Sequence, residues 1–303
     1  MINKVAVLGL GALAFVSGQA TAQLRVVATT PDLASVAREI GGDKVNVVAL
    51  AKPTEDPHFV DAKPSFIVTL NRADMLVEGG AELELGWLPP LLENSRNTKI
   101  AAGAPGRVSA NEGIRMLEVP TTFDRSKGDI HSKGNPHFLT DPLNAKIVAA
   151  NIESHLEQVD PANAATYKAN LAKFNATIDT RLAQWKKTLA PYAGGKVVTY
   201  HKDFPYFAER FGLQVIENLE PKPGIAPSPA HVAQVIQLMK TQNTHVILVQ
   251  PFQDQKTAET VARQTEGKVL MVPQQPGAIA QDTSYFDMID HMVNTIAAAF
   301  AGK

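Results

Sequence analysis

Cysteine is absent from the 303 residues, which excludes disulfide bonds and a cysteine that could carry a lipid anchor. Aromatic residues make up only 6% of the chain, which is few for a site that binds an organic solute between aromatic side chains. The formal net charge is −1 with acids and bases interspersed, so neither a nucleic acid nor an anionic membrane is expected as a partner. After the first 22 residues, no apolar run approaches the roughly twenty residues of a membrane-spanning helix.

The first 22 residues predict an export signal. Lys4 precedes an apolar run over residues 5–16, and small residues at 20–22 form a cleavage site. About twelve apolar residues are too few to cross a bilayer. We therefore expect residues 1–22 to be removed and the mature protein to lie free in the periplasm.

The next eighty residues alternate between strand and helix patterns. A β-branched stretch at 24–30 is followed by helical spacing that ends on Gly41 and Gly42, as helices often do. The remaining patterns indicate strands at 44–51, 74–80 and 98–103 and helices at 64–73 and 83–95. The order βαβαβαβ predicts a parallel sheet covered by helices.

Residues 105–140 are rich in Gly, Pro, Asp and Lys and predict an irregular surface segment. Helical periodicity returns at 141–156. Residues 160–192, about thirty without an internal proline or glycine, predict one helix of about 45 Å. Strand and helix patterns then alternate again from 196, and a helix at 285–301 closes the chain.

These patterns predict an α/β protein with two (β/α) lobes that a single long helix bridges. The expected N-terminal lobe comprises residues 23–157, the linking helix 158–192 and the C-terminal lobe 193–303. No internal repeat or low-complexity tract is evident.

Three histidines stand where a ligand site is expected. In open α/β sheets, ligands bind outside the carboxyl ends of the strands. His58 follows the strand pattern that ends near residue 51, and His201 directly follows the pattern at 196–200, so both should face the crevice between the lobes. His137 lies in the irregular segment, which could fold over that crevice. Three imidazoles suit zinc, with copper, nickel or iron as alternatives, whereas each histidine alone is more simply a hydrogen-bonded loop residue.

The residues around these histidines resemble those of a known family. The stretches "HFVDAKPS" (58–65), "GNPHFLTDPLNA" (134–145) and "YHKDFPYFAERFGL" (200–213), spaced around a long helix, are similar to the zinc and manganese solute-binding proteins of bacterial ABC transporters. The resemblance covers nearly the whole mature chain.

The resemblance implies that His58, His137 and His201 bind a metal ion in the cleft between the lobes. A histidine at the third position, where the manganese branch has glutamate, favours zinc, in agreement with the preference of manganese for oxygen ligands. Relatives often carry a long histidine-rich tract before the second ligand, and this chain has only His131 there. His131 is therefore either a residue that helps to load the metal or a solvated loop histidine.

The sequence does not decide which residue is the fourth ligand of the expected site. Relatives supply an aspartate late in the chain, and the first acid near that place is Asp282. Tetrahedral zinc otherwise needs another oxygen or a water. The further candidates are Gln250, Glu55 and Asp56. Glu220 and Lys222 are interpreted as a surface ion pair, or as residues that line the cleft or contact the permease.

The expected function is capture of zinc ion in the periplasm and its delivery to an ABC permease in the inner membrane, without enzymatic activity. A periplasmic metallochaperone is a possible donor, and a monomer is expected. Three alternatives are kept: a manganese or iron carrier of the same family, a zinc-dependent hydrolase and an organic-solute binder. A hydrolase would use a zinc-bound water, yet the compact HExxH motif is absent from the sequence.

Overall fold

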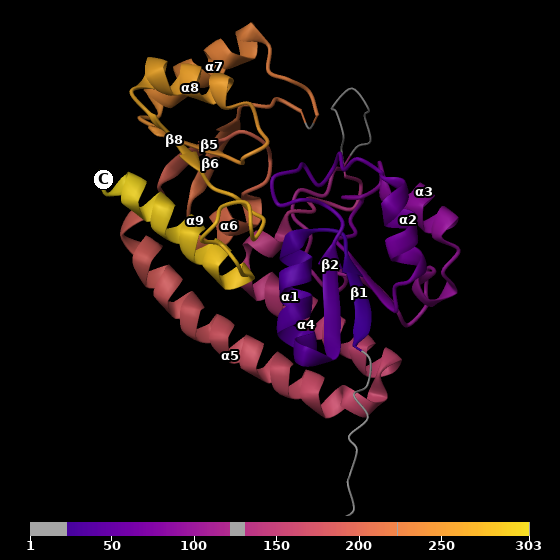
Figure 1. The fold of residues 1–303 in the computed structure, drawn as a ribbon. Coiled ribbons are helices and arrows are strands. Elements are labelled where there is room, and N and C mark those ends of the chain that lie inside the picture. Colours follow the sequence, from indigo (N-terminus) through magenta and orange to yellow (C-terminus); the bar gives the residue numbers. More distant parts are fainter. Residues whose placement is uncertain (1–22, 122–130, 223, 303) are drawn as a thin grey trace, which may run out of the picture.

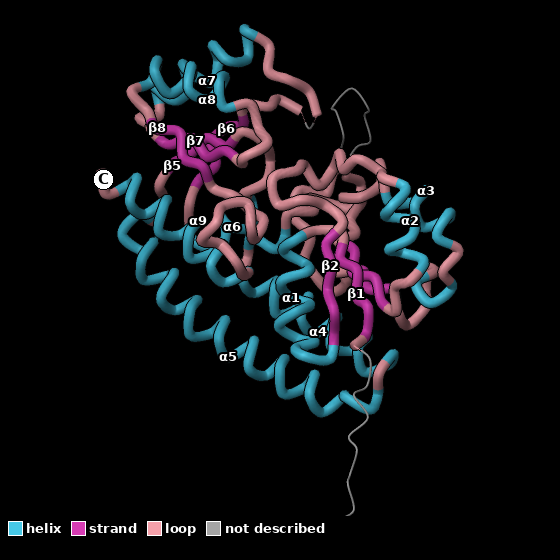
Figure 2. Tube along the Cα trace, viewed as in Figure 1, coloured by secondary structure: helices cyan, strands magenta, loops and turns pink. Residues whose placement is uncertain are grey.

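The computed structural model describes residues 23–121, 131–222 and 224–302. The expected signal at 1–22 lies outside these residues. Two separate parallel sheets form two α/β lobes, and a long helix runs beneath both (Figures 1 and 2). The predicted fold class is therefore confirmed.

The first sheet has the strand order β2-β1-β3-β4, with all neighbours parallel. Its strands are β1 Leu24–Ala28, β2 Val45–Ala49, β3 Met75–Glu78 and β4 Arg107–Ser109. Its helices are α1 Pro31–Gly41, α2 Pro64–Asn71, α3 Leu88–Ser95 and α4 Pro142–Val159. Alternate residues of β1 face opposite ways: Val26 belongs to the core shared with α1 and α4, and Val27 to the core under α2 and α3.

The second sheet repeats this arrangement with the order β6-β5-β7-β8, again all parallel. Its strands are β5 Lys196–Thr199, β6 Gln214–Asn218, β7 Val246–Val249 and β8 Lys268–Met271. Its helices are α6 Pro205–Phe211, α7 Pro229–Thr241, α8 Gln255–Thr265 and α9 Tyr285–Phe300. The core under α7 and α8 contains Val198 and Ile247, while Leu248 faces the core toward α6 and α9.

The bridging helix α5 spans Ala164–Leu189. The prediction of 160–192 was too long at both ends, because short 3₁₀ turns at Pro161–Asn163 and Ala190–Tyr192 flank the α-helix. One stripe of α5 is buried, with members Tyr167, Phe174, Ile178, Leu182, Trp185 and Leu189. This stripe packs on α1 and α4 of the first lobe and on α9 of the second, so one rigid element belongs to both cores.

The prediction of a strand at 98–103 was wrong. Thr98–Ile100 is a 3₁₀ turn, and the fourth strand of the first sheet lies later, at Arg107–Ser109, inside the segment expected to be irregular. Asn97 favours the turn, since its side chain accepts a hydrogen bond from the backbone N–H of Lys99.

An ion pair joins the lobes close to the cleft. The guanidinium of Arg210 on α6 donates two hydrogen bonds of 2.7 Å to the two carboxylate oxygens of Asp141. Asp141 also caps α4 by accepting from the N–H of Leu143 at 2.9 Å.

In the described part of the chain, no helix has the length and apolar character that crossing a membrane requires.

Candidate metal centre

The three histidines come from three loops at the carboxyl ends of strands or the start of a helix. His58 lies in the loop that follows β2, and His201 lies two residues after β5. His137 directly precedes the 3₁₀ turn Phe138–Thr140, which leads into α4. Because parallel strands present their carboxyl ends at one edge, the two sheets bring His58 and His201 to opposite walls of one cleft.

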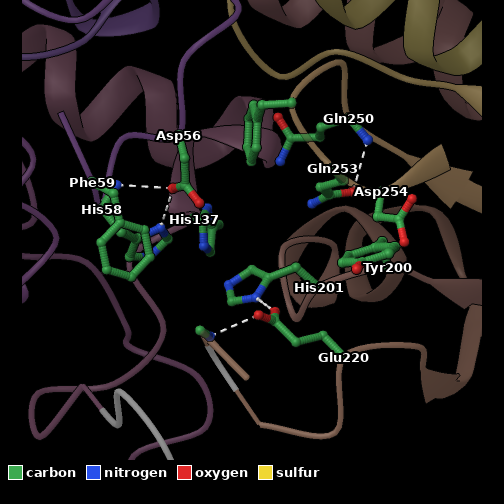
Figure 3. A pocket seen from close by; sticks show the side chains of 12 residues that line it. Asp56, His58, Phe59, His137, Tyr200, His201, Glu220, Gln250, Gln253 and Asp254 are labelled. Carbon is green, nitrogen blue, oxygen red and sulfur yellow. Dashed lines mark hydrogen bonds and ion pairs between the residues drawn. The ribbon is translucent and has the colours of Figure 1, made fainter. Parts of the chain in front are cut away.

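The structure brings these three side chains together. One ring nitrogen of each lies within 4.8 Å of one ring nitrogen of both others. The ring centroids are 5.1 Å apart for His58 and His137, 5.4 Å for His58 and His201 and 5.2 Å for His137 and His201. Figure 3 shows the rings converging from the two lobes. The Nε2 atoms of His58 and His137 are buried and have no hydrogen-bond partner among the described residues, although most buried polar atoms in proteins have one.

Two carboxylates hold the opposite nitrogens of the rings. Nδ1 of His58 lies 2.8 Å from Oδ1 of Asp56, and Nδ1 of His201 lies 2.5 Å from Oε2 of Glu220 (Figure 3). An ionised carboxylate only accepts, so each Nδ1 carries the proton and donates it. This fixes the tautomer in which Nε2 has its lone pair free, as metal-binding histidines require.

Asp56 and Glu220 are themselves fixed by the backbone. The N–H of His58 donates to Oδ1 of Asp56 at 3.0 Å, which closes an Asx turn. The N–H of Gly224 donates to Oε1 of Glu220 at 2.7 Å. Lining of the cleft was one of the roles expected of Glu220, and it does line the cavity, but its contact with His201 was not predicted. Glu220 lies two residues after β6, and its N–H donates to the carbonyl of Tyr200 at 2.8 Å, so the pairing of β6 with β5 continues to Glu220 and places it beside His201. The sequence around residue 220 does not indicate which strand pairs with β6.

Asn135 connects two of the histidine segments. Its Oδ1 accepts from the N–H of His137 at 2.9 Å, and its Nδ2 donates to the carbonyl of Lys202 at 2.7 Å. The hydroxyl of Tyr206 donates to the Asn135 carbonyl at 2.8 Å. The indole of Trp87, which the sequence analysis did not single out for the site, donates to the carbonyl of Pro57 at 2.9 Å and holds the His58 loop.

The electrostatic surroundings of the rings differ. Burial, together with the nearby charges of His58 and His201, lowers the pKa of His137 well below its ordinary value. Burial also lowers the pKa of His201, but the hydrogen bond to Glu220 and the charges of nearby carboxylates outweigh it, so the pKa is raised. Burial raises the pKa of Asp56, but its hydrogen bond to His58 outweighs this and the pKa is lowered.

The rings line a cavity of about 170 Å³ between the lobes. Its other lining residues come from both lobes and are Asp56, Phe59, Tyr200, Glu220, Gly224, Gln250, Phe252, Gln253 and Asp254. The metal site expected in the interlobe cleft therefore has a matching cavity.

The structure does not bring Asp282 to this group. Its carboxylate lies 4.0 Å from Nδ1 of His291 on α9, and it does not line the cavity. The reason is local, because the chain after β8 first places Gln274 and Gln275 near the cleft. The side chain of Gln274 donates to the carbonyl of Asp203, and that of Gln275 accepts from the N–H of Asp32. The chain then forms a turn, in which the N–H of Gly277 donates to the carbonyl of Asp282.

Gln250 lines the cavity, but its side-chain amide is engaged elsewhere. Nε2 donates to Oδ2 of the fully buried Asp203 at 2.5 Å. Burial raises the pKa of Asp203 to about 6 although this bond and the charge of His201 lower it.

His131 lies beside the group rather than in solvent. Its ring centroid is 5.2 Å from that of His58, with an angle of 33° between the rings. Its Nε2 atom is buried and has no partner, as in His58 and His137. Burial and the nearby charges of His58 and His201 lower the pKa of His131 to about 4.

The remaining described histidines have structural partners. His155 bonds to the carbonyl of Pro105, His231 to that of Asn218, and His245 to that of Thr265. His291 lies next to the carbonyl of Met271 at 3.5 Å. These four lie outside the cluster of described residues suited to a metal ion.

Two parallel-sheet lobes, a bridging helix and a cleft with three convergent imidazoles define a solute-binding protein for a metal ion. The family model "Zinc-uptake complex component A periplasmic" matches residues 26–299. The chain belongs to this family.

Individual relatives are distant but cover most of the chain. The manganese ABC transporter substrate-binding lipoprotein PsaA of Streptococcus anginosus is 25% identical over 82% of this chain and 78% of its own length. The iron ABC transporter substrate-binding lipoprotein MtsA of Streptococcus pyogenes serotype M1 is 25% identical over 80% and 76%. A crystal structure of ZnuA superposes with a TM-score of 0.78 at 25% identity and covers 92% of this chain and 99% of that one.

Membership makes the chain the substrate-binding component of a metal ABC transporter, whose partner is a membrane permease with its ATPase. The family consists of transport components, so the protein is not an enzyme and the hydrolase alternative is abandoned. Its substrate is a divalent metal ion, and the organic-solute alternative is abandoned as well. The relatives carry names of manganese and iron carriers, so membership alone leaves the choice among zinc, manganese and iron open.

Proposed function

We propose that the protein captures zinc ion through His58, His137 and His201 and delivers it to its permease. The observation that supports this most is the convergence of one nitrogen from each ring within 4.8 Å, with two of the Nε2 atoms buried and unpartnered. Zinc bonds to imidazole nitrogen at about 2.0–2.1 Å in tetrahedral geometry, so nitrogens that lie within 4.8 Å of one another need to move inward by at most about 1 Å on binding.

The donor set supports zinc over manganese. Three neutral nitrogens face the cavity, while the two nearest carboxylates, Asp56 and Glu220, are turned to the Nδ1 atoms behind the rings. Manganese and magnesium prefer carboxylate, carbonyl and water oxygens, whereas imidazole suits zinc, copper, nickel and iron. Iron therefore remains the chemically reasonable second candidate, and one relative is named for it.

The cellular setting follows from the same proposal. We place the protein in the periplasm after removal of residues 1–22, as a monomer that docks on an inner-membrane permease, with a periplasmic metallochaperone as a possible donor. The division into 23–157, 158–192 and 193–303 remains our prediction for the domain boundaries.

Metal analysis followed by competition titration tests the proposal. Protein purified without chelator should carry zinc, and a chelator competition should give a lower Kd for zinc than for manganese or ferrous iron. Tighter binding of manganese or iron would overturn the zinc assignment and leave the family assignment intact.

A further inference from the structure

The proposed site has three histidines, and a fourth imidazole stands next to it without a partner. The rings of His131 and His58 are separated by 5.2 Å, a spacing equal to those among the three histidines, which range from 5.1 to 5.4 Å. Nε2 of His131 is buried and has no hydrogen-bond partner. An unpaired buried nitrogen costs free energy, so its retention calls for a ligand.

A carboxylate from the first lobe holds the chain next to His131. The N–H and the hydroxyl of Ser132 donate to the two oxygens of Glu82, each at 2.5 Å. The N–H of Gly134 then donates to the carbonyl of His131 at 3.1 Å, which closes a turn. Gly134 has a φ of +100°, and a Cβ there would come within 2.8 Å of the carbonyl oxygen of Leu117. Residues 131–134 are thus fixed in place by contacts on both sides.

Glu82, which binds Ser132 of this turn, and its neighbour Ala81 have an unfavourable backbone conformation. Ala81 and Glu82 have φ values of 50° and 68°, a left-handed region that is unfavourable for a residue with a Cβ. Two successive residues of this kind place the Glu82 carboxylate against Ser132. Strain of this sort is typical of functional sites, and here its result is that His131 is presented to His58.

The other candidates for a fourth ligand are less well placed. Asp282 does not line the cavity, and its carboxylate lies 4.0 Å from Nδ1 of His291. Gln250 lines the cavity but donates to Asp203 through its Nε2. The carboxylates of Asp56 and Glu220 hold the Nδ1 atoms of two of the histidines. His131 and His58 both line a second cavity of about 240 Å³, together with Phe59, Glu82, Leu83, Leu85 and Gly86.

We propose that His131 is the fourth protein ligand of the captured cation, presented by the Glu82–Ser132 contact. The inference rests on the proposed function, because it concerns the same cation. Of the three other histidine rings, His131 contacts that of His58. It reaches the ion by rotation of its own side chain, while Ser132 stays bonded to Glu82. A shell of four neutral imidazoles suits zinc, copper or nickel and disfavours manganese.

X-ray absorption at the zinc edge tests this on the full mature chain loaded with one zinc per protein. Scattering from four imidazoles is expected for the wild type and from three for His131→Ala and His131→Gln. The zinc dissociation rate should rise by about tenfold or more in both. Glu82→Gln should increase the dissociation rate in the same direction by a smaller factor. His155→Ala, which removes a histidine bonded to a backbone carbonyl, should match the wild type.

Three imidazoles in both the wild type and His131→Ala, with equal dissociation rates, would overturn the inference while the proposed function stands. A wild-type protein that binds no zinc would overturn the proposed function itself. Thermal unfolding of each variant without metal shows whether a loss of binding reflects loss of the fold, and His131→Gln keeps the test valid if the alanine variant is unstable.

Discussion

Nδ1 of His201 lies 2.5 Å from a carboxylate oxygen of Glu220, nineteen residues further along the chain. The equivalent nitrogen of His58 is held by Asp56 at 2.8 Å. His58 belongs to the first lobe and His201 to the second, so each lobe supplies one proposed ligand whose tautomer and ring orientation are already set. The cost of ordering these two rings is thus met during folding rather than on metal binding.

Removal of these carboxylates should weaken the metal site without removing a ligand. Glu220→Gln and Asp56→Asn should each raise the Kd for zinc by about 10- to 100-fold, because the ring loses its orientation and basicity. Competition titration with a zinc chelator measures this. Glu209→Gln is a matched control, since Glu209 pairs with Arg115 on the surface. An unchanged Kd in Glu220→Gln would show that the contact does not support binding.

Loss of a ligand should have a larger effect. We predict that His58→Ala, His137→Ala and His201→Ala each raise the Kd for zinc by about 100-fold or more. His245→Ala should change nothing, since that ring bonds to the carbonyl of Thr265 and to Asn243. A Kd equal to that of the wild type in any of the first three variants would remove that residue from the site.

Metal capture should leave the distance between the lobes nearly unchanged. The helix α5 packs on both lobes, and the pair of Arg210 with Asp141 joins them beside the cleft. We therefore expect loop and side-chain movement rather than wide closure, and a change in radius of gyration below about 1 Å in solution scattering, because rigid packed elements resist continuous deformation. A change of several ångströms between metal-free and zinc-loaded protein would contradict this.

The buried carboxyl of Glu84 should make stability depend on pH. It accepts bonds from the hydroxyl of Thr29 and the N–H groups of Gly79 and Gly80, yet burial raises its pKa from 4.5 to about 7. The folded state therefore binds this proton more tightly than the unfolded state. The stabilising contribution is complete below pH 4.5 and is lost as pH rises toward 7, by up to about 3 kcal/mol.

Urea unfolding of wild type and Glu84→Gln at pH 5 and pH 8 measures this contribution. The free energy of unfolding of the variant should improve relative to the wild type as pH rises, because glutamine does not ionise. Glu112→Gln, at an exposed position, should run parallel to the wild type. Parallel curves for Glu84→Gln would show that Glu84 titrates as in the unfolded chain.

Much of this architecture is readable from periodicity. The strands of both sheets except β4 contain short apolar runs that can be recognised in the sequence, and the α5 stripe has clear helical spacing. The short strand β4 was missed because Arg107–Ser109 has only one buried residue, Val108, and its neighbours are glycine and proline. A strand of three residues, which pairs only with β3, is too short to show an alternating pattern of apolar and polar residues.

The candidate site was predictable where position in a sheet decides it. His58 and His201 follow strands, whereas His137 needed the resemblance to a family, because its segment has no regular pattern. Asp56 lies two residues before His58 and forms an Asx turn, so a local signal existed for it. Glu220, Asn135 and the Glu82–Ser132 contact depend on tertiary folding over 19 to 67 residues, which no local pattern encodes.

Diffraction from zinc-loaded crystals, measured on both sides of the zinc absorption edge, tests the central claim most directly. The account predicts one strong anomalous peak in the interlobe cavity, at about 2.0–2.1 Å from Nε2 of His58, His137 and His201. A peak bound to other residues, or a ring among these three that faces away from the ion, would contradict it.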